Sequence, residues 1–175
     1  GVDFIVCDHH TPGTELPPAI ILNPKQTDCN YPFKELSGCG VGFKLVQALN
    51  QIRGRSFDEI YSLLDLVMVS IGADIVSMNG ENRILAFHGL EVLNKKPRLG
   101  FSKLIQLANK TGVLNITDVV FILAPRINAA GRIASGNKAV ELLLAKTFDE
   151  VDQISIDINA HNETRKGLDK EITAE

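Results

Sequence analysis

A short apolar run near the start of the chain ends abruptly in a carboxylate and two imidazoles. Residues 2–6 are rich in Val, Ile and Phe, and Asp8, His9 and His10 follow almost at once. An unbroken run of this kind is typical of a strand buried on both faces of a parallel sheet. Ligands of open α/β sheets bind just beyond the carboxyl ends of the strands, which is where these three side chains would lie.

The three polar residues at this strand end have the chemistry of metal ligands. Aspartate and neutral imidazole both bind divalent cations such as Mn²⁺ and Zn²⁺. We therefore predict a metal site at the end of the first strand. The alternative is a polar strand end without chemistry, which three such residues in succession make less favoured than a lone Asp-His pair would.

A glycine segment precedes a helical pattern in the next part of the chain. Residues 19–22 are predicted to form a second short strand, closed by Asn23-Pro24. Gly38 and Gly40 then lead into residues 43–49, whose apolar residues have helical spacing. The N–H groups at such a helix start can bind an anion, although the segment matches neither the dinucleotide-binding pattern nor the P-loop. Close packing of the helix against a strand is the alternative explanation for the glycines.

A further carboxylate candidate lies at the end of an apolar helix. Ser56 and Glu59 have the spacing of a capping box, and they predict one helix that is apolar nearly all round between residues 63 and 71. This helix is predicted to be central and to end around Asp74. We expect the Asp74 carboxylate to be buried, so that it needs a cation, a hydrogen bond or a charged partner. A helix-terminal or turn aspartate is the alternative.

A polar run rich in arginine occupies residues 124–132. It contains Arg126, Asn128 and Arg132, directly after an apolar helical pattern. Guanidinium groups bind phosphate oxygens through two parallel hydrogen bonds, so the run is suited to a phosphodiester. A loop in which the arginines bind carboxylates or carbonyls is the alternative.

The last part of the chain has the pattern of one long helix. Thr147 and Glu150 have capping-box spacing, and apolar residues follow in steps of three and four. No stop signal appears before Glu175. We therefore predict two parts: residues 1–147 as a domain portion, and residues 148–175 as the start of a long connector helix.

The composition fits one globular domain with or without an extension. The 175 residues are 45% hydrophobic and 22% charged, and the formal net charge of -3 argues against a broad electrostatic surface for nucleic acid. A narrow site that holds phosphate through metal ions and a few arginines remains compatible with this charge.

No apolar run approaches the roughly 20 residues of a membrane span. Three cysteines without metal-binding spacing favour a reducing cytoplasm, and the chain is expected to be cut from a longer protein.

Several of these stretches together resemble the RecJ family, the single-strand-specific 5′→3′ DNA exonucleases of the DHH phosphoesterase superfamily. The likeness covers almost the whole chain. The triplet at residues 8–10 marks only the superfamily, whereas the run from Pro125 to Arg132 points to RecJ within it. The matching segments are residues 6–10, 23–25, 36–45, 73–76, 80–83 and 124–132.

The resemblance implies roles for the candidate site residues. His9 and Asp74 would be metal ligands. His10 would contact the scissile phosphate or transfer a proton, and Asp8 would orient an imidazole, the usual partner of a ligating histidine. The residues that would hold the DNA backbone are Arg126, Asn128, Arg132, Gly38 and Gly40.

The same resemblance implies the fold and the chemistry. The expected fold class is α/β: a remnant of a DHH-type parallel-sheet domain, mostly helical, with residues 1–147 as the C-terminal part of the catalytic domain. Two Mn²⁺ or Mg²⁺ ions would serve the hydrolysis of single-stranded DNA, for repair and recombination. Two aspartate motifs before residue 1 and further domains after residue 175 would complete the enzyme, so this chain alone is expected to be inactive. Phe4 and Ile5 would then be poorly covered, and the exposed sheet edge would favour self-association.

Two other functions stay open at this point. One is a DHH phosphodiesterase that acts on small (di)nucleotides, and the other is a DHH-like domain without enzymatic activity that binds a partner protein. The arginine run at residues 124–132 favours the exonuclease over both.

Overall fold

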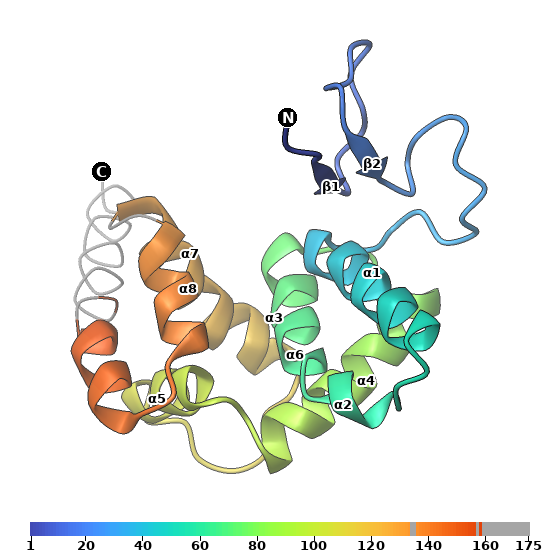
Figure 1. The fold of residues 1–175 in the computed structure, drawn as a ribbon. Helices are drawn as coiled ribbons and strands as arrows, with labels where there is room; N and C mark the ends of the chain where they lie inside the picture. The colour runs from blue at the N-terminus through green and yellow to red at the C-terminus, as the bar shows by residue number, and fades with distance from the viewer. Residues whose placement is uncertain (134–135, 157, 159–175) are drawn as a thin grey trace, which may run out of the picture. The chain divides into compact units, whose positions relative to one another are not determined.

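The chain forms two compact units in the computed structural model, which describes residues 1–133, 136–156 and 158, with the side chains of 129–133 excluded. The first unit comprises Gly1–Val92, and the second begins at Leu93. Both contain fully buried apolar side chains. Figure 1 shows the order of the elements along the chain.

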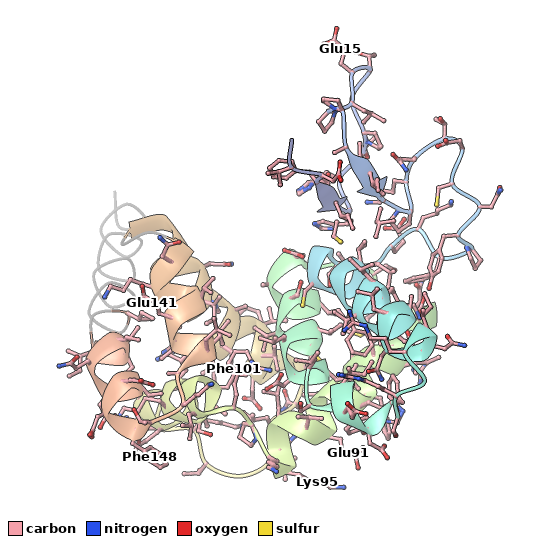
Figure 2. The ribbon with its side chains drawn as sticks, viewed as in Figure 1. Glu15, Glu91, Lys95, Phe101, Glu141 and Phe148 are labelled. Atoms are coloured by element: carbon pink, nitrogen blue, oxygen red, sulfur yellow. The ribbon has the colours of Figure 1, made fainter. Side chains whose placement is uncertain are left out.

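A small parallel sheet opens the first unit. Strands β1 (Ile5–Cys7) and β2 (Ile20–Leu22) lie side by side, with Ile5 opposite Ile20 (Figure 1). Parallel strands need a long connection, which residues 8–19 supply without a helix. Glu15 lies at the tip of this connection (Figure 2). Both predicted strands are confirmed, and they are parallel as expected.

The sheet residues are less covered than those of a strand buried on both faces. Phe4 is 66% exposed, Ile5 54% and Ile20 60%. A strand becomes buried on both faces only when neighbouring strands and covering helices surround it. The predicted poor cover of Phe4 and Ile5 is therefore confirmed, and full burial of β1 is not found within the described residues.

Helices form the rest of the first unit. Helix α1 (Gly38–Ile52) packs against α3 (Leu64–Asp74), and the short α2 (Asp58–Tyr61) lies between them in sequence. Helix α4 (Gly80–Lys95) runs across the boundary of the two units.

Helix α3 is central to the first unit, as predicted. Four of its large apolar side chains are at most 1% exposed, and each such burial contributes about 1.5–3 kcal/mol. A Cβ atom on Gly89 would collide with the carbonyl of Leu64, so this glycine lets α4 approach α3 closely. The four buried side chains are Leu64, Val67, Met68 and Ile71.

The single helix predicted to start at Ser56 and run on to Asp74 is wrong, because the segment is divided into α2 and α3. The Ser56 hydroxyl accepts the N–H of Asp58 at 3.2 Å and lies 3.3 Å from its carboxylate. Since Ser56 bonds two residues ahead, it forms no capping box with Glu59, and only one helical turn follows.

The regular elements in the described part of the second unit are all helical. They are α5 (Leu99–Leu107), α6 (Ile116–Asp118), the π-helical η1 (Val119–Leu123), α7 (Ala124–Ile133), α8 (Gly136–Leu144) and the helical residues 148–156. Phe101, which is labelled in Figure 2, lies on α5. Its side chain is fully buried. A Cβ atom on Gly100 would collide with the carbonyl of Leu142, so α5 and α8 approach closely there. No helix among the described residues is long and apolar enough to cross a membrane.

The second predicted capping box is confirmed. The N–H of Glu150 donates to Thr147 Oγ1 at 3.3 Å, and the Glu150 carboxylate accepts the N–H of Thr147 at the same distance. Val151 and Ile158 are buried on the helix that follows. The rest of the predicted connector helix lies outside the described residues, so the boundary at 147/148 remains a prediction.

Candidate metal and phosphate site

Polar side chains gather where the two strands end. Asp8, His9 and His10 follow β1, and Asn23 follows β2. Because the strands are parallel, both ends lie at the same edge of the sheet. The N–H of Asp8 donates to the carbonyl of Leu22 at 3.1 Å, which carries the pairing one residue beyond β1 and into the polar triplet.

His9 lies close to Asp74, as the metal-ligand prediction requires. The Nε2 atom of His9 is 3.8 Å from Oδ2 of Asp74, and the two side chains are 16% and 36% exposed. Two ligands of one divalent cation with bond lengths near 2.1 Å can be at most roughly 4 Å apart. The separation therefore fits two donors on one cation.

The predicted burial of Asp74 is wrong. Asp74 is the last residue of α3, and its Oδ2 atom also accepts a hydrogen bond from Ser70 Oγ at 3.2 Å. The helix stops here because Ile75 adopts a left-handed conformation, with φ of 53°. Asp74 is thus a helix-terminal aspartate, and its partly exposed carboxylate faces an imidazole.

Asp8 organises the turn that follows β1. Its Oδ1 atom accepts the N–H of His9 at 2.8 Å and that of His10 at 3.3 Å, and it lies 2.7 Å from His10 Nδ1. The hydrogen bond to the His10 ring is the main cause that lowers the pKa of Asp8 below its ordinary value, and the two N–H groups act in the same direction. The imidazole that Asp8 orients is therefore that of His10, whose side chain is 78% exposed.

Asn23 supports the site in a way that the residue pattern alone did not reveal. It is buried, its Nδ2 donates to the carbonyl of His10 at 2.8 Å, and its Oδ1 accepts the N–H of Lys25 at 2.9 Å. The side chain therefore joins the end of β2 to the backbone of His10. The signal in the sequence was a polar amide directly after a buried-strand pattern, since a buried amide must be hydrogen-bonded.

The predicted glycine segment lies against His9. Gly38 opens α1, and Ser37 caps the helix by accepting the N–H of Gly40 at 3.2 Å. A Cβ atom on Gly38 would lie 3.4 Å from His9 Cδ2, so the glycine keeps the space beside the imidazole small but open. Since the N–H of Gly40 is already donated to Ser37, Gly38 is the better placed of the two for an anion. Phosphate binding by either glycine remains a prediction.

The polar run at residues 124–132 is helical rather than a loop. It follows the π-helical η1, at whose end the N–H of Ala124 donates to the carbonyl of Val119. Pro125 has no N–H and its ring crowds the preceding turn, which is a recognised cause of irregular helix geometry. The chain accommodates the proline by widening the turn that precedes it.

The candidate phosphate ligands in this run differ in exposure. Arg126 is 6% exposed, and its Nη1 donates to the carbonyl of Ile122 at 2.9 Å. Asn128 is exposed. Arg132 belongs to α7 by its backbone, and its side chain lies outside the described residues. A phosphate contact by Arg126 would need movement that uncovers its guanidinium, so its role remains a prediction.

Within the described residues, no group of three or more His, Cys, Asp or Glu side chains could hold a metal ion. A hard divalent cation takes about six ligands, mostly oxygens. His9 and Asp74 therefore fit as two members of a larger ligand set.

Comparison with known proteins shows which family model and which relatives this chain resembles. The model of the DHH family, N-terminal domain, matches residues 1–71. The single-stranded-DNA-specific exonuclease RecJ of Bacillus subtilis (strain 168) is 44% identical over 177 residues, which cover the whole of this chain and 22% of that protein. The same exonuclease of Escherichia coli (strain K12) is 38% identical over 187 residues, which cover the whole chain and 32% of that protein. The chain thus spans about a fifth to a third of the length of these curated relatives.

Solved structures agree with the sequence comparisons. A crystal structure of RecJ from Thermus thermophilus in complex with Mn²⁺ superposes with a TM-score of 0.85 at 32% identity, over 98% of this chain and 26% of that chain. A crystal structure of exonuclease RecJ bound to manganese has the same TM-score at 34% identity, over 98% of this chain and 43% of that chain. Residues 1–71 of the chain are therefore similar to the DHH family, N-terminal domain, and its whole length aligns with part of the RecJ proteins.

Proposed function

We propose that the protein of which this chain is a part is a metal-dependent exonuclease that hydrolyses single-stranded DNA from its 5′ end. The observation that carries the proposal is the approach of His9 to Asp74, at 3.8 Å, in a chain that aligns end to end with RecJ exonucleases. In this proposal the chain supplies only some of the ligands and substrate contacts, and it spans 22% and 32% of the two relatives' length.

His9 and Asp74 are the metal ligands in this proposal. Support comes from the solved RecJ structures, which contain Mn²⁺ or Mg²⁺. When bound, such an ion polarises a phosphate oxygen and lowers the pKa of a bound water. Asp74 supplies a hard oxygen donor and His9 an imidazole nitrogen, and this mixed set suits Mn²⁺.

Asp8 and His10 act next to these ligands. His10 is exposed beyond the strand end, where it can reach a phosphate oxygen or exchange a proton with it. Asp8 holds the imidazole through Nδ1, so that Nε2 is the atom directed at the substrate. Asn23 holds the backbone of the same histidine.

The DNA backbone is held by residues of the glycine segment and the arginine run. Gly38 is suited to an anion because it opens a helix of 15 residues, where N–H groups and the helix dipole favour negative charge. Asn128 is exposed and can donate its amide to phosphate. Gly40, Arg126 and Arg132 complete the proposed set. Such contacts are independent of base identity, which suits an enzyme without sequence preference.

Digestion by the full-length protein tests the proposal. Labelled single-stranded, double-stranded and dinucleotide substrates are incubated with Mn²⁺, and the label is placed at either end. We expect release of nucleotides from the 5′ end of the single strand alone, and Asp74→Ala is expected to abolish it. Preferred hydrolysis of the dinucleotide would favour a small-nucleotide phosphodiesterase. No hydrolysis of any substrate would favour a domain that binds a partner protein.

The setting and domain organisation complete the proposal. Residues 1–147 form the C-terminal part of the catalytic domain, and residues 148–175 begin the connector helix. The capping box at Thr147 and Glu150 supports a helix start at this place. We place the protein in the cytoplasm, where its DNA substrate lies.

A further inference from the structure

The N-terminus of α4 contacts the loop that precedes the glycine segment of the candidate site. This loop, residues 29–36, is the last part of the connection from β2 to Ser37 and Gly38. Three consecutive residues of α4 contact it: Gly80, Glu81 and Asn82. They lie in the segment 80–83, to which the proposed function assigns no role.

Glu81 binds the loop and α1 at once. Its Oε2 accepts the hydroxyl of Tyr31 at 2.7 Å, and its Oε1 lies 2.7 Å from Nζ of Lys44 on α1. Burial raises the pKa of Tyr31, and the hydrogen bond and charge of Glu81 raise it further. The phenol therefore remains a donor at neutral pH, and both carboxylate oxygens of Glu81 are occupied.

Gly80 provides space for the same loop. Its φ is +47°, a conformation that favours glycine. A Cβ atom there would lie 2.7 Å from Cε2 of Phe33, so the aromatic ring rests directly on the glycine. A side chain at residue 80 would have to displace Phe33 and, with it, the loop.

Asn82 connects the two segments that carry the site. It is fully buried, and its Nδ2 donates to the carbonyl of Glu35 at 2.6 Å and to that of Ser77 at 2.9 Å. Its Oδ1 has no hydrogen-bond partner among the described residues. The two hydrogen bonds that Nδ2 donates are therefore the reason why an asparagine suits this position. We call this pair of hydrogen bonds the Asn82 tie. Its Glu35 end is followed in the chain by Ser37 and Gly38, and its Ser77 end is preceded by Asp74.

The two ends of this tie reach the two proposed metal ligands. Gly38 lies against the His9 ring, with 3.4 Å between its virtual Cβ and Cδ2. Ser77 lies three residues after Asp74, beyond the left-handed turn at Ile75. We propose that Asn82, supported by Glu81, is a positioning residue that sets His9 against Asp74 by holding the segments that flank both. The inference rests in part on the proposed metal site. The test below tells a failure of that metal site apart from a failure of the inference.

The test compares two buried asparagines of the first unit in the full-length protein. Asn50 is the matched control: it is 8% exposed, and its Nδ2 also donates to two backbone carbonyls, those of Arg55 and Ser56. Asn82→Ala and Asn50→Ala each remove two hydrogen bonds from a buried amide to backbone carbonyls, so both are expected to lose stability. Of the two, Asn82 is the one tied to the segments beside His9 and Asp74.

The first readout is the His9 ring in metal-free protein labelled at histidine, assigned with His9→Ala. We expect Asn82→Ala to shift the His9 ring resonances at constant pH, and Asn50→Ala to leave them in place. The second readout is Mn²⁺ affinity by calorimetry, where Asn82→Ala should weaken binding by about 10-fold or more, as for other residues that orient ligands. Asn82→Asp keeps the shape but loses both donors, and it should behave like Asn82→Ala.

Unchanged His9 resonances in Asn82→Ala would overturn the inference, as would wild-type behaviour of Asn82→Asp. If Asn82→Ala does not fold, Glu81→Gln takes its place, and it should shift the same resonances by a smaller amount. Unchanged resonances in that variant would also overturn the inference. A wild-type protein without Mn²⁺ affinity would contradict the proposed metal site, while the His9 resonances would still decide whether Asn82 positions the ring.

Discussion

His9 and Asp74 approach to 3.8 Å between Nε2 and Oδ2, although one follows a strand and the other ends a helix. No local pattern brings them together. The pairing follows from the packing of α1 against α3 and from Gly38, which places the start of α1 beside the His9 ring. Two elements thus contribute one proposed ligand each, and a bound metal should couple them.

The coupling of these two ligands to Mn²⁺ is the first prediction. His9→Ala and Asp74→Ala should each lower the Mn²⁺ affinity of the full-length protein by about 10-fold or more. The double variant should lose less than the sum of the two free energies, because residues that share one ligand set are not additive. Calorimetry of the four proteins measures this. The 175-residue chain alone should bind Mn²⁺ weakly, and affinity that survives both substitutions would refute the assignment.

The second prediction separates Arg126 from Asn128. Asn128→Ala should weaken single-stranded DNA binding about equally for different sequences, without a change in the free energy of unfolding, because Asn128 is exposed. Arg126→Ala should weaken DNA binding and also destabilise the protein by about 1–3 kcal/mol, because the guanidinium is buried and bonded to Ile122.

Binding at several salt concentrations together with chemical unfolding measures both variants. A lost contact between arginine and phosphate should also reduce the salt dependence of binding. If Arg126→Ala changes only the stability, and leaves affinity, salt slope and turnover as they are, then Arg126 is a structural arginine.

The third prediction concerns the exposed sheet. Ile5 and Ile20 lie opposite each other in the β1–β2 pair and are both more than half exposed. Exposed apolar strands with unpaired edges associate with one another. The 175-residue chain should therefore self-associate in a concentration series by analytical ultracentrifugation, and Ile5→Lys should reduce this. Leu144→Lys is the control, since Leu144 is 67% exposed on helix α8. A chain that is monomeric at all concentrations would contradict the prediction.

Local patterns predicted the parts of the fold that local physics determines. The two strands, the central position of α3 and the capping box at Thr147 all depend on residues close in sequence, and all are confirmed. The polar residues of the candidate site could be predicted from the sequence for the same reason, because Asp8, His9 and His10 are consecutive.

The remaining features depend on contacts that a single sequence does not display. The exposure of Asp74 follows from the turn at Ile75, an unfavourable place for a β-branched residue that helical periodicity cannot anticipate. The tie of Asn82 to Glu35 joins residues far apart in the chain. The burial of Arg126 is likewise a matter of packing, and composition alone made it resemble an exposed phosphate ligand.

The fourth prediction uses the acid sensitivity of the helix that begins after Thr147. The N–H of Lys146 is the main cause that lowers the pKa of Glu150, followed by the N–H of Thr147. A carboxylate with a lowered pKa stabilises the fold above its unfolded pKa, about 4.3, and this contribution is lost as the pH falls through the folded value. Between about pH 6 and pH 3, the free energy of unfolding should therefore fall more steeply for the wild-type chain than for Glu150→Gln. Parallel pH profiles would show that the cap contributes nothing.

The last prediction concerns the turn after Asp74. Ile75 has φ of 53° and is 82% exposed, so its side chain loses little packing when removed, while its backbone conformation costs about 1–3 kcal/mol. Ile75→Gly should therefore stabilise the fold by about 1 kcal/mol, after allowance for the greater freedom of glycine in the unfolded chain. The looser turn should also weaken Mn²⁺ binding, because Asp74 immediately precedes it. The control is Asn109→Gly, at φ of 51°, where asparagine tolerates the conformation and little change is expected. Chemical unfolding measures the stability and calorimetry measures the Mn²⁺ binding. If Ile75→Gly is less stable than the wild type, then contacts of the isoleucine side chain stabilise the turn by more than its left-handed backbone conformation costs.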